Sequence, residues 1–231
     1  MIDSLVTIQG GRYPESLVYE AAALLKNHAV VVHPTETVHG YGCRYDSADA
    51  VERIRCIKES KQNKPMILLV PGKKWVDILC RNIPELAWRL IELFWPGPLT
   101  VVFQARAGTR KVCPWLGETV ALRQNAHPFT SRVLTEFDLP IVSTSLNRSG
   151  QPSPGNLRRY MEDLARKHNA EPRLRPELIV LDEKLTQGNA QPSTVVSIVN
   201  KKSVRLIREG ALSAAQIAEK AGIKTIGVFE D

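Results

Sequence analysis

The sequence has few cysteines and no long apolar run, and each of these absences excludes a class of protein. Its 231 residues include four cysteines, spaced far apart, with no CxxC pair and no cysteine–histidine cluster. A zinc site and a disulfide framework are therefore not expected, and we interpret the cysteines as reduced packing residues. No stretch approaches the ~20 apolar residues of a membrane span. The N-terminus lacks the order of charges typical of a signal peptide, so we expect a cytoplasmic protein with no membrane partner.

Three common catalytic and cofactor-binding motifs are also missing. No GxxxxGK[ST] loop occurs, which excludes a Walker-type phosphate binder, and no GxGxxG follows the first predicted strand, which argues against a Rossmann cofactor. No GxSxG occurs, which removes the commonest serine hydrolase signature. Composition and spacing alone therefore do not name a reaction.

Charge is the main bias in what the sequence does contain. Lys and Arg number 31 against 24 Asp and Glu, a formal net charge of +7. Such an excess suits an anionic partner, for example a nucleotide or tRNA. The densest basic run extends from Arg158 to Lys167, with Arg173 and Arg175 beyond it, and its spacing predicts an exposed helix followed by a loop. An ordinary solvated surface and a nucleic-acid contact both remain open for this run.

Hydrophobic periodicity predicts helices and strands in alternation along the chain. Helices are expected over residues 13–27, 50–60, 73–81, 85–94, 128–138, 157–168 and 213–222. Strands are expected over residues 29–33, 66–70, 99–104, 119–123, 140–144, 178–181, 194–199, 204–207 and 225–229. The connections are short and no change of composition marks a linker. The pattern therefore predicts one α/β domain over residues 1–231, built on a single twisted sheet.

Polar side chains gather at the ends of four predicted strands. These clusters are Pro34–Thr37, Arg123–Asn125, Ser143–Asn147 and Ser193–Thr194. Ligands of open α/β sheets bind outside the strand ends, so the clusters could converge on one site. An arginine fork with hydroxyl and amide groups suits an anion or a carboxylate. For each cluster alone, turn formation by Ser and Thr is the alternative.

Six segments share their order and spacing with the motifs of one known family. They are Pro34–Gly40, Ile57–Ser60 with Lys64–Met66, Trp95–Thr100, Ser143–Gly150, Pro192–Val196 and Arg208–Ala211. In these segments, and over about residues 10 to 212, the chain resembles the YrdC family of threonylcarbamoyl-AMP synthases. The resemblance implies a stand-alone synthase domain with a mixed twisted β-sheet, flanking helices and a deep basic groove.

The resemblance also implies a reaction and its participants. L-threonine, bicarbonate and ATP would be condensed to threonylcarbamoyl-AMP with release of pyrophosphate, and Mg²⁺ would accompany the triphosphate. The product would serve downstream proteins that transfer the threonylcarbamoyl group to a tRNA adenosine. Contact with tRNA or double-stranded RNA through the basic groove is a further expectation. Two rival hypotheses remain: a related carbamoyl or nucleotidyl transfer to another acceptor, and a catalytically weakened RNA-binding paralogue.

The family's site residues carry over by position in the motifs. Lys58 would be catalytic; Thr35, Arg123, Ser143 and Ser193 would bind threonine; and Lys64, Thr119, Ser145, Asn147, Ser153 and Arg208 would bind ATP. Every reaction partner is anionic, so preorganised positive charge is the largest expected catalytic contribution.

Three positions within the motifs need separate interpretation. Ser60 stands where the family has an arginine, and Lys61 or Lys64 could restore the lost charge. His39 stands where many members have tyrosine, and we expect it to be a packed or hydrogen-bonded loop residue rather than a catalyst. Trp95, beside two prolines and a glycine, is expected to be scaffold.

Overall fold

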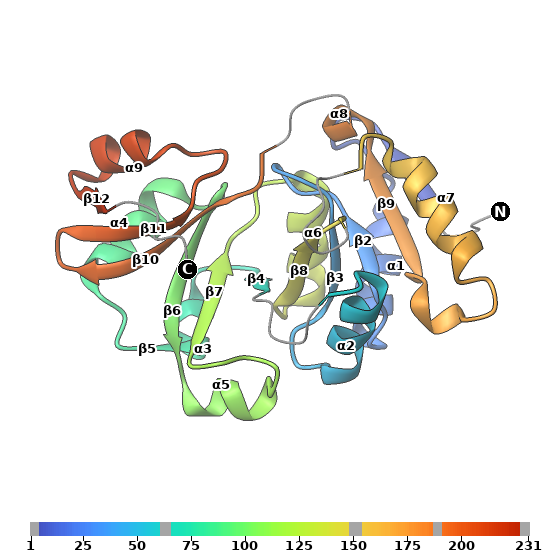
Figure 1. Ribbon diagram of the computed structural model, residues 1–231, viewed down its shortest axis with the longest axis horizontal. Coiled ribbons are helices and arrows are strands. Elements are labelled where there is room, and N and C mark those ends of the chain that lie inside the picture. Colours follow the sequence, from blue (N-terminus) through green and yellow to red (C-terminus); the bar gives the residue numbers. More distant parts are fainter. Residues whose placement is uncertain (1–4, 61–65, 148–153, 187–190, 227–231) are drawn as a thin grey trace.

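One mixed β-sheet runs through the protein. The computed structural model describes residues 5–60, 66–147, 154–186 and 191–226. In spatial order the strands of the sheet are β1 (Leu5–Ile8), β9 (Leu178–Asp182), β2 (Val31–His33), β3 (Gly40–Arg44), β8 (Ile141–Ser145), β4 (Ile67–Leu69), β7 (Thr119–Arg123), β6 (Leu99–Ala105), β10 (Thr194–Asn200), β11 (Ser203–Arg208) and β12 (Lys224–Ile226), and β5 (Cys80–Arg81) pairs with β6 off this path (Figure 1). The α/β class and the mixed sheet expected from the sequence are confirmed.

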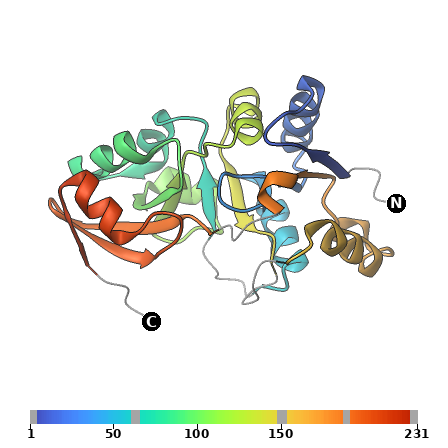
Figure 2. The ribbon, with the colours of Figure 1, turned by 90° about the horizontal axis from the view of Figure 1, so that it is seen from above.

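Helices cover both faces of the sheet. They are α1 (Glu15–Lys26), α2 (Ala48–Ile57), α3 (Lys74–Leu79), α4 (Glu85–Phe94), α5 (Ala107–Val112), α6 (Pro128–Phe137), α7 (Leu157–Lys167), α8 (Glu183–Thr186) and α9 (Ala214–Ala221), with a 3₁₀ turn at Pro172–Leu174. Figure 2 shows α1 and α6 on one side of the sheet and α2 and α7 on the other. Among the described residues, no helix combines the length and apolar character needed to cross a bilayer.

Two apolar clusters hold these layers together. The smaller joins α1 and α6 to the strands beside them through side chains such as Leu25, Phe129 and Val180. The larger includes Ile54 of α2 and Leu90 of α4, and extends across the centre of the sheet. Trp95 belongs to this larger cluster, is 5% exposed and donates its indole N–H to the carbonyl of Leu99 at 2.6 Å. Its expected scaffold role agrees with this burial.

The observed elements match most of the predicted ones, and the differences have local causes. Helix 85–94 and strand 119–123 have the predicted bounds. The helix expected over 73–81 ends at Leu79, because Cys80 and Arg81 pair with β6. Strands β1, β3 and β5 and helices α5 and α8 were not predicted. Residues 227–229 of the last predicted strand lie outside the described part of the chain.

Candidate functional site

The polar strand ends meet around one cavity of about 230 Å³. Its lining includes eight of the eleven residues singled out from the sequence: Thr35, Lys58, Arg123, Ser143, Ser145, Asn147, Ser193 and Arg208. They come from the turn after β2, the end of α2, the carboxyl ends of β7 and β8, the residue before β10 and the end of β11. Sheet order, rather than closeness along the chain, brings them together.

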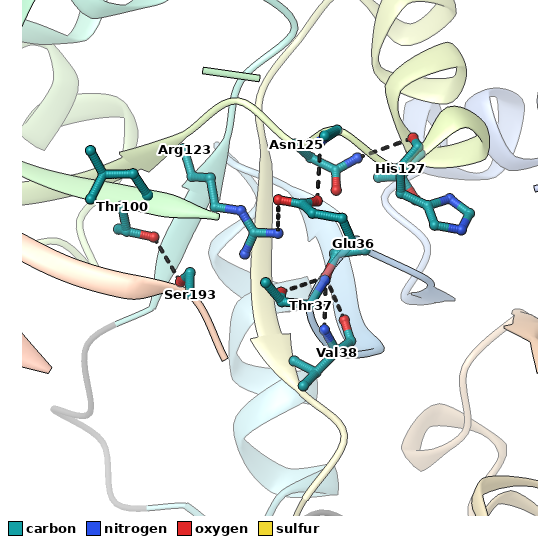
Figure 3. A network of polar contacts seen from close by, with 12 residues as sticks. Glu36, Thr37, Val38, Thr100, Arg123, Asn125, His127 and Ser193 are labelled. Carbon is teal, nitrogen blue, oxygen red and sulfur yellow. Dashed lines mark hydrogen bonds and ion pairs between the residues drawn. The ribbon is translucent and has the colours of Figure 1, made fainter. Parts of the chain in front are cut away.

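Arg123 supplies a buried positive charge to this cavity. Its side chain is 3% exposed, and Nη2 lies 2.8 Å from Oε1 of Glu36 in an ion pair (Figure 3). Burial lowers the pKa of the Arg123 guanidinium, and the nearby Glu36 carboxylate partly offsets this effect. Its Nε atom makes no hydrogen bond with any residue that the structure describes. The guanidinium therefore keeps donor capacity for an anionic ligand.

Glu36 was not among the residues predicted from the sequence. It connects the turn after β2 with the loop after β7, since its Oε2 atom accepts the main-chain N–H of Ala126 at 3.0 Å while Oε1 faces Arg123. The available signal was its place in the polar cluster Pro34–Thr37. Its pairing could not be read from the sequence, because the partner strand lies far along the chain.

Thr35 organises the turn that forms one wall of the cavity. Its hydroxyl donates to the carbonyl of Val38 at 2.6 Å and accepts the main-chain N–H groups of Thr37 and Val38 at 3.2 and 3.1 Å. The residue is 2% exposed. Thr35 therefore does both: it stabilises the turn, which was the alternative considered for this cluster, and it lines the cavity.

Ser193 and Arg208 form the opposite wall. The Ser193 hydroxyl shares a 2.9 Å hydrogen bond with that of Thr100 (Figure 3), and Nη2 of Arg208 donates to the Ser193 carbonyl at 2.8 Å. Burial lowers the pKa of Arg208, and the positive charge of Arg123 lowers it further. The two guanidinium groups thus act on the same space, where an anion would relieve their repulsion.

Lys58 holds the loop that follows β8. It lies at the end of α2, is 3% exposed and donates from Nζ to the carbonyl of Ser145 and, at 2.7 Å, to that of Asn147. The Ser145 hydroxyl in turn donates to the Asn147 side chain. The ammonium therefore fixes the two polar residues that the family resemblance assigns to the nucleotide.

Three buried histidines and one aspartate form a connected group beside the cavity, and one of them, His39, belongs to its lining. His33 shares a 3.3 Å contact with the Ser143 hydroxyl, and Nε2 of His39 accepts the main-chain N–H of Asp182 at 2.8 Å. The Asp182 carboxylate lies 3.1 Å from Nε2 of His127. Burial lowers the pKa of His33 to about 3 and of His39 to about 4, and it lowers that of His127 as well. His39 is 3% exposed, which confirms the expected packed, hydrogen-bonded position.

Of the three remaining predicted site residues, the structure describes only Thr119. Thr119 is exposed at the start of β7, four residues and about 13 Å of strand from Arg123, and does not line the cavity. Lys64 and Ser153, together with Lys61, lie outside the described residues. The structure therefore does not bring Thr119 to this site.

Ser60 also lies away from the lining. Its hydroxyl is buried and has no hydrogen-bond partner among the residues that the structure describes. The neighbouring Glu59 forms an ion pair with Lys167 of α7, so its negative charge is matched by a cation from another element.

A larger cavity, of about 650 Å³, is separate from this site. It is lined by Leu5, Arg158, Glu162, Ala165, Arg166, Asn169 and Arg175. None of the described residues that were singled out for threonine or ATP lines it. The basic run found in the sequence thus forms the exposed helix that was predicted, and part of its positive charge faces this second cavity.

Comparisons with known proteins identify the family to which the chain is similar. A model of the family Sua5_yciO_yrdC, described as "Telomere recombination", matches residues 23–210. Relatives named "Threonylcarbamoyl-AMP synthase" include those of Bacillus subtilis (37% identity, 64% of this chain and 43% of the relative), Pyrococcus abyssi (32%, 91% and 59%) and Pseudoalteromonas translucida (32%, 83% and 98%). The chain thus spans about half the length of the first two relatives and nearly all of the third.

Among solved structures, one similar fold is the "Crystal structure of P. abyssi Sua5 complexed with L-threonine". The TM-score is 0.79 at 28% identity, and the similarity covers 96% of this chain and 62% of that one.

Proposed function

Because this chain belongs to the Sua5–YciO–YrdC family, we propose that it synthesises threonylcarbamoyl-AMP from L-threonine, bicarbonate and ATP and releases pyrophosphate. The observation that carries the proposal is the 230 Å³ cavity, in which the buried cations Lys58 and Arg123 and the more exposed Arg208 face a set of hydroxyl and amide groups. The names of the relatives and the threonine complex of one of them support it.

Arg123 is proposed to bind the carboxylate of threonine. Its side chain lines the cavity, and Glu36 fixes the orientation of the guanidinium. Ser143, Ser193 and Thr35 would surround the amino acid with short polar groups. A charge-assisted hydrogen bond in a site shielded from water is stronger than one in solution, so this pair would select an amino acid with a free carboxylate.

Lys58, Ser145, Asn147 and Arg208 are proposed to face the nucleotide. The threonine nitrogen would bond to the bicarbonate carbon with loss of water, and an oxygen of the resulting carbamate would attack the α-phosphorus while the bond to pyrophosphate breaks. Negative charge accumulates on the transferred group and on the leaving group. Positive groups already held in place stabilise that charge with little rearrangement.

The remaining participants are proposed on chemical grounds. Mg²⁺ would enter with ATP, bound by the triphosphate oxygens. Within the described ranges, no group of three or more His, Cys, Asp or Glu side chains could hold a metal ion, so we assign none of these residues to the magnesium. Lys64 and Ser153 would complete the ATP side, whereas Thr119 has no part in the proposal.

The cellular context follows from the product. A mixed anhydride of this kind would supply a protein that transfers the threonylcarbamoyl group to a tRNA adenosine, and we propose that the chain works in the cytoplasm. We also propose that residues 1–231 act as one domain. The supporting observation is that the cavity takes residues from both halves of the continuous sheet.

Pyrophosphate release tests the proposed function. The protein is incubated with Mg-ATP and bicarbonate, with or without L-threonine. We expect pyrophosphate together with an equal amount of threonylcarbamoyl-AMP, detected by mass spectrometry, only when threonine is present. Equal pyrophosphate release without threonine would overturn the proposal. Replacing bicarbonate with carbamoyl phosphate separates this reaction from a related carbamoyl transfer.

A further inference from the structure

His39 is held in one tautomer by the main chain. Its Nε2 atom accepts the N–H of Asp182 at 2.8 Å, so that ring nitrogen carries no proton. In a neutral imidazole the proton then lies on Nδ1. Asp182 is itself fixed, because its carboxylate accepts the N–H groups of Gly10 and Gly11 at 3.1 and 2.8 Å. The anchor for the ring is therefore rigid.

The proton on Nδ1 has no acceptor in the described part of the protein. No hydrogen bond from Nδ1 to a described residue is present, and Nδ1 is not among the polar atoms that are sealed in the interior without a partner. His39 lines the 230 Å³ cavity although it is only 3% exposed. The ring therefore presents an N–H donor to the cavity.

The surroundings keep this donor uncharged. The charged and titratable groups that act on the ring are His127 and Asp182, and His33 also lies close enough to interact. The pKa of His39 is lowered to about 4: burial is the largest cause, the neighbouring His127 also lowers the pKa, and Asp182 raises it. The imidazole is thus neutral near pH 7, unlike the three cations of the cavity.

We propose that His39 is a substrate-binding residue that donates its Nδ1–H to a carboxylate or carbamate oxygen of the bound amino acid. The assignment rests on the proposed function. Its position favours the amino-acid end of the cavity, since it interacts with His33, whose Nε2 atom lies 3.3 Å from the Ser143 hydroxyl, a group we assign to threonine. His39 would add a neutral donor where further positive charge would repel Arg123.

Two substitutions separate the hydrogen bond that His39 accepts from Asp182 from the N–H group that it donates. In His39→Gln the side-chain oxygen can reach the Nε2 position and accept the Asp182 N–H, but no donor remains at the Nδ1 position. In His39→Asn the amide nitrogen can take the Nδ1 position, but nothing reaches Asp182. We expect His39→Gln to keep the wild-type Tm and to lose about tenfold in kcat/KM for threonine. We expect His39→Asn to have a lower Tm than His39→Gln but a higher kcat/KM for threonine.

If His39 had a purely structural role, the variant with the lower Tm would also be the less active one. The proposed role predicts the reverse, with His39→Gln the more stable and the less active variant. A His39→Gln protein as active as wild type would overturn the assignment, and so would activity losses that follow Tm in both variants. Wild-type protein without threonine-dependent pyrophosphate release would instead contradict the proposed function itself.

A measurement on the unaltered protein covers the case in which a variant fails to fold. In protein labelled with ¹⁵N-histidine, we expect one imidazole with its proton on Nδ1 whose Nδ1 resonance shifts when L-threonine is added to saturation. Five histidines are present, so the signals can be resolved and assigned. An unshifted Nδ1 resonance for His39 would overturn the proposal.

Discussion

At Arg123 the fold keeps a positive charge almost out of contact with water and offsets it with a single carboxylate, Glu36. Removing an ion from water is unfavourable by several kcal/mol unless it is paired. Arg208 adds to the unfavourable energy, because its charge and that of Arg123 repel each other across the cavity. The binding of an anion would therefore stabilise both guanidinium groups at once.

The first prediction concerns Arg123 itself. Arg123→Ala should weaken threonine binding by about 2–4 kcal/mol, or about 30- to 1,000-fold, because a charge-assisted pair in a buried site is lost. Arg123→Lys should recover part of this loss, since it keeps the charge without the planar fork. Isothermal titration with threonine in the presence of Mg-ATP measures both values.

A matched control tests whether net charge alone explains the effect. Arg158→Ala removes an exposed arginine that lines the separate 650 Å³ cavity, so threonine affinity should stay at the wild-type value. Equal weakening by Arg123→Ala and Arg158→Ala would contradict a specific carboxylate contact at Arg123.

At the scale of single elements, β3 shows what a local sequence pattern cannot reveal. Its two glycines weaken the strand signal, yet β3 lies in the interior of the sheet between β2 and β8. A Cβ at Gly42 would lie 2.9 Å from the His33 ring, and one at Gly40 would lie 3.0 Å from the Ser143 hydroxyl. The need for glycine arises from residues elsewhere in the chain. Strands with apolar or alternating side chains, such as β7, were located correctly because their signal is local.

The second prediction concerns the turn after β11. A Cβ at Gly210 would lie 2.1 Å from the carbonyl oxygen of Pro192, so the backbone beside Ser193 would have to move. Gly210→Ala should lower the free energy of unfolding by about 1–3 kcal/mol, equivalent to about 2–12 °C in Tm. Threonine-dependent turnover should also fall, because Ser193 and Arg208 would be displaced together.

The control for this substitution is Gly108→Ala in α5. An added methyl group there meets no atom within 4 Å, and alanine is favoured over glycine in a helix by up to about 1 kcal/mol. Calorimetry should show an unchanged or raised Tm for Gly108→Ala. A Gly210→Ala protein as stable as this control would contradict the close approach to Pro192.

At the scale of the whole molecule, pairing between segments that are distant in the sequence limits which contacts can be predicted. The strand-end clusters could be found because each is local, and the sheet then brings eight of the chosen residues to one cavity. The contacts of the buried histidines beside the cavity could not be predicted from the sequence. His39 and Asp182 are separated by 143 positions, and β1 pairs in parallel with β9 from the other end of the chain. Such partners depend on strand order, which local patterns do not specify.

The third prediction concerns the pH dependence of stability. Burial lowers the pKa values of His33, His39 and His127, whereas in the unfolded chain histidine titrates near 6.5. Between about pH 6.5 and pH 4 the unfolded state therefore binds protons that the folded state does not. The free energy of unfolding should fall as pH decreases through this window, by up to about 1.4 kcal/mol per pH unit for each histidine.

Urea unfolding at pH 7.5, 6.5, 5.5 and 4.5 measures this slope. His39→Gln should reduce the slope by the contribution of one group. A stability that is constant from pH 6.5 to 4.5 would contradict the burial of neutral imidazoles.

The cavity lining extends from Thr35 to Arg208, which has a consequence for the chain during its synthesis. A growing polypeptide cannot assemble the site until β11 has left the ribosome, however early α1 and β2 become ordered. Any fragment that stops before β11 lacks one wall of the cavity. The proposed ligand binding therefore requires a chain that extends at least through β11.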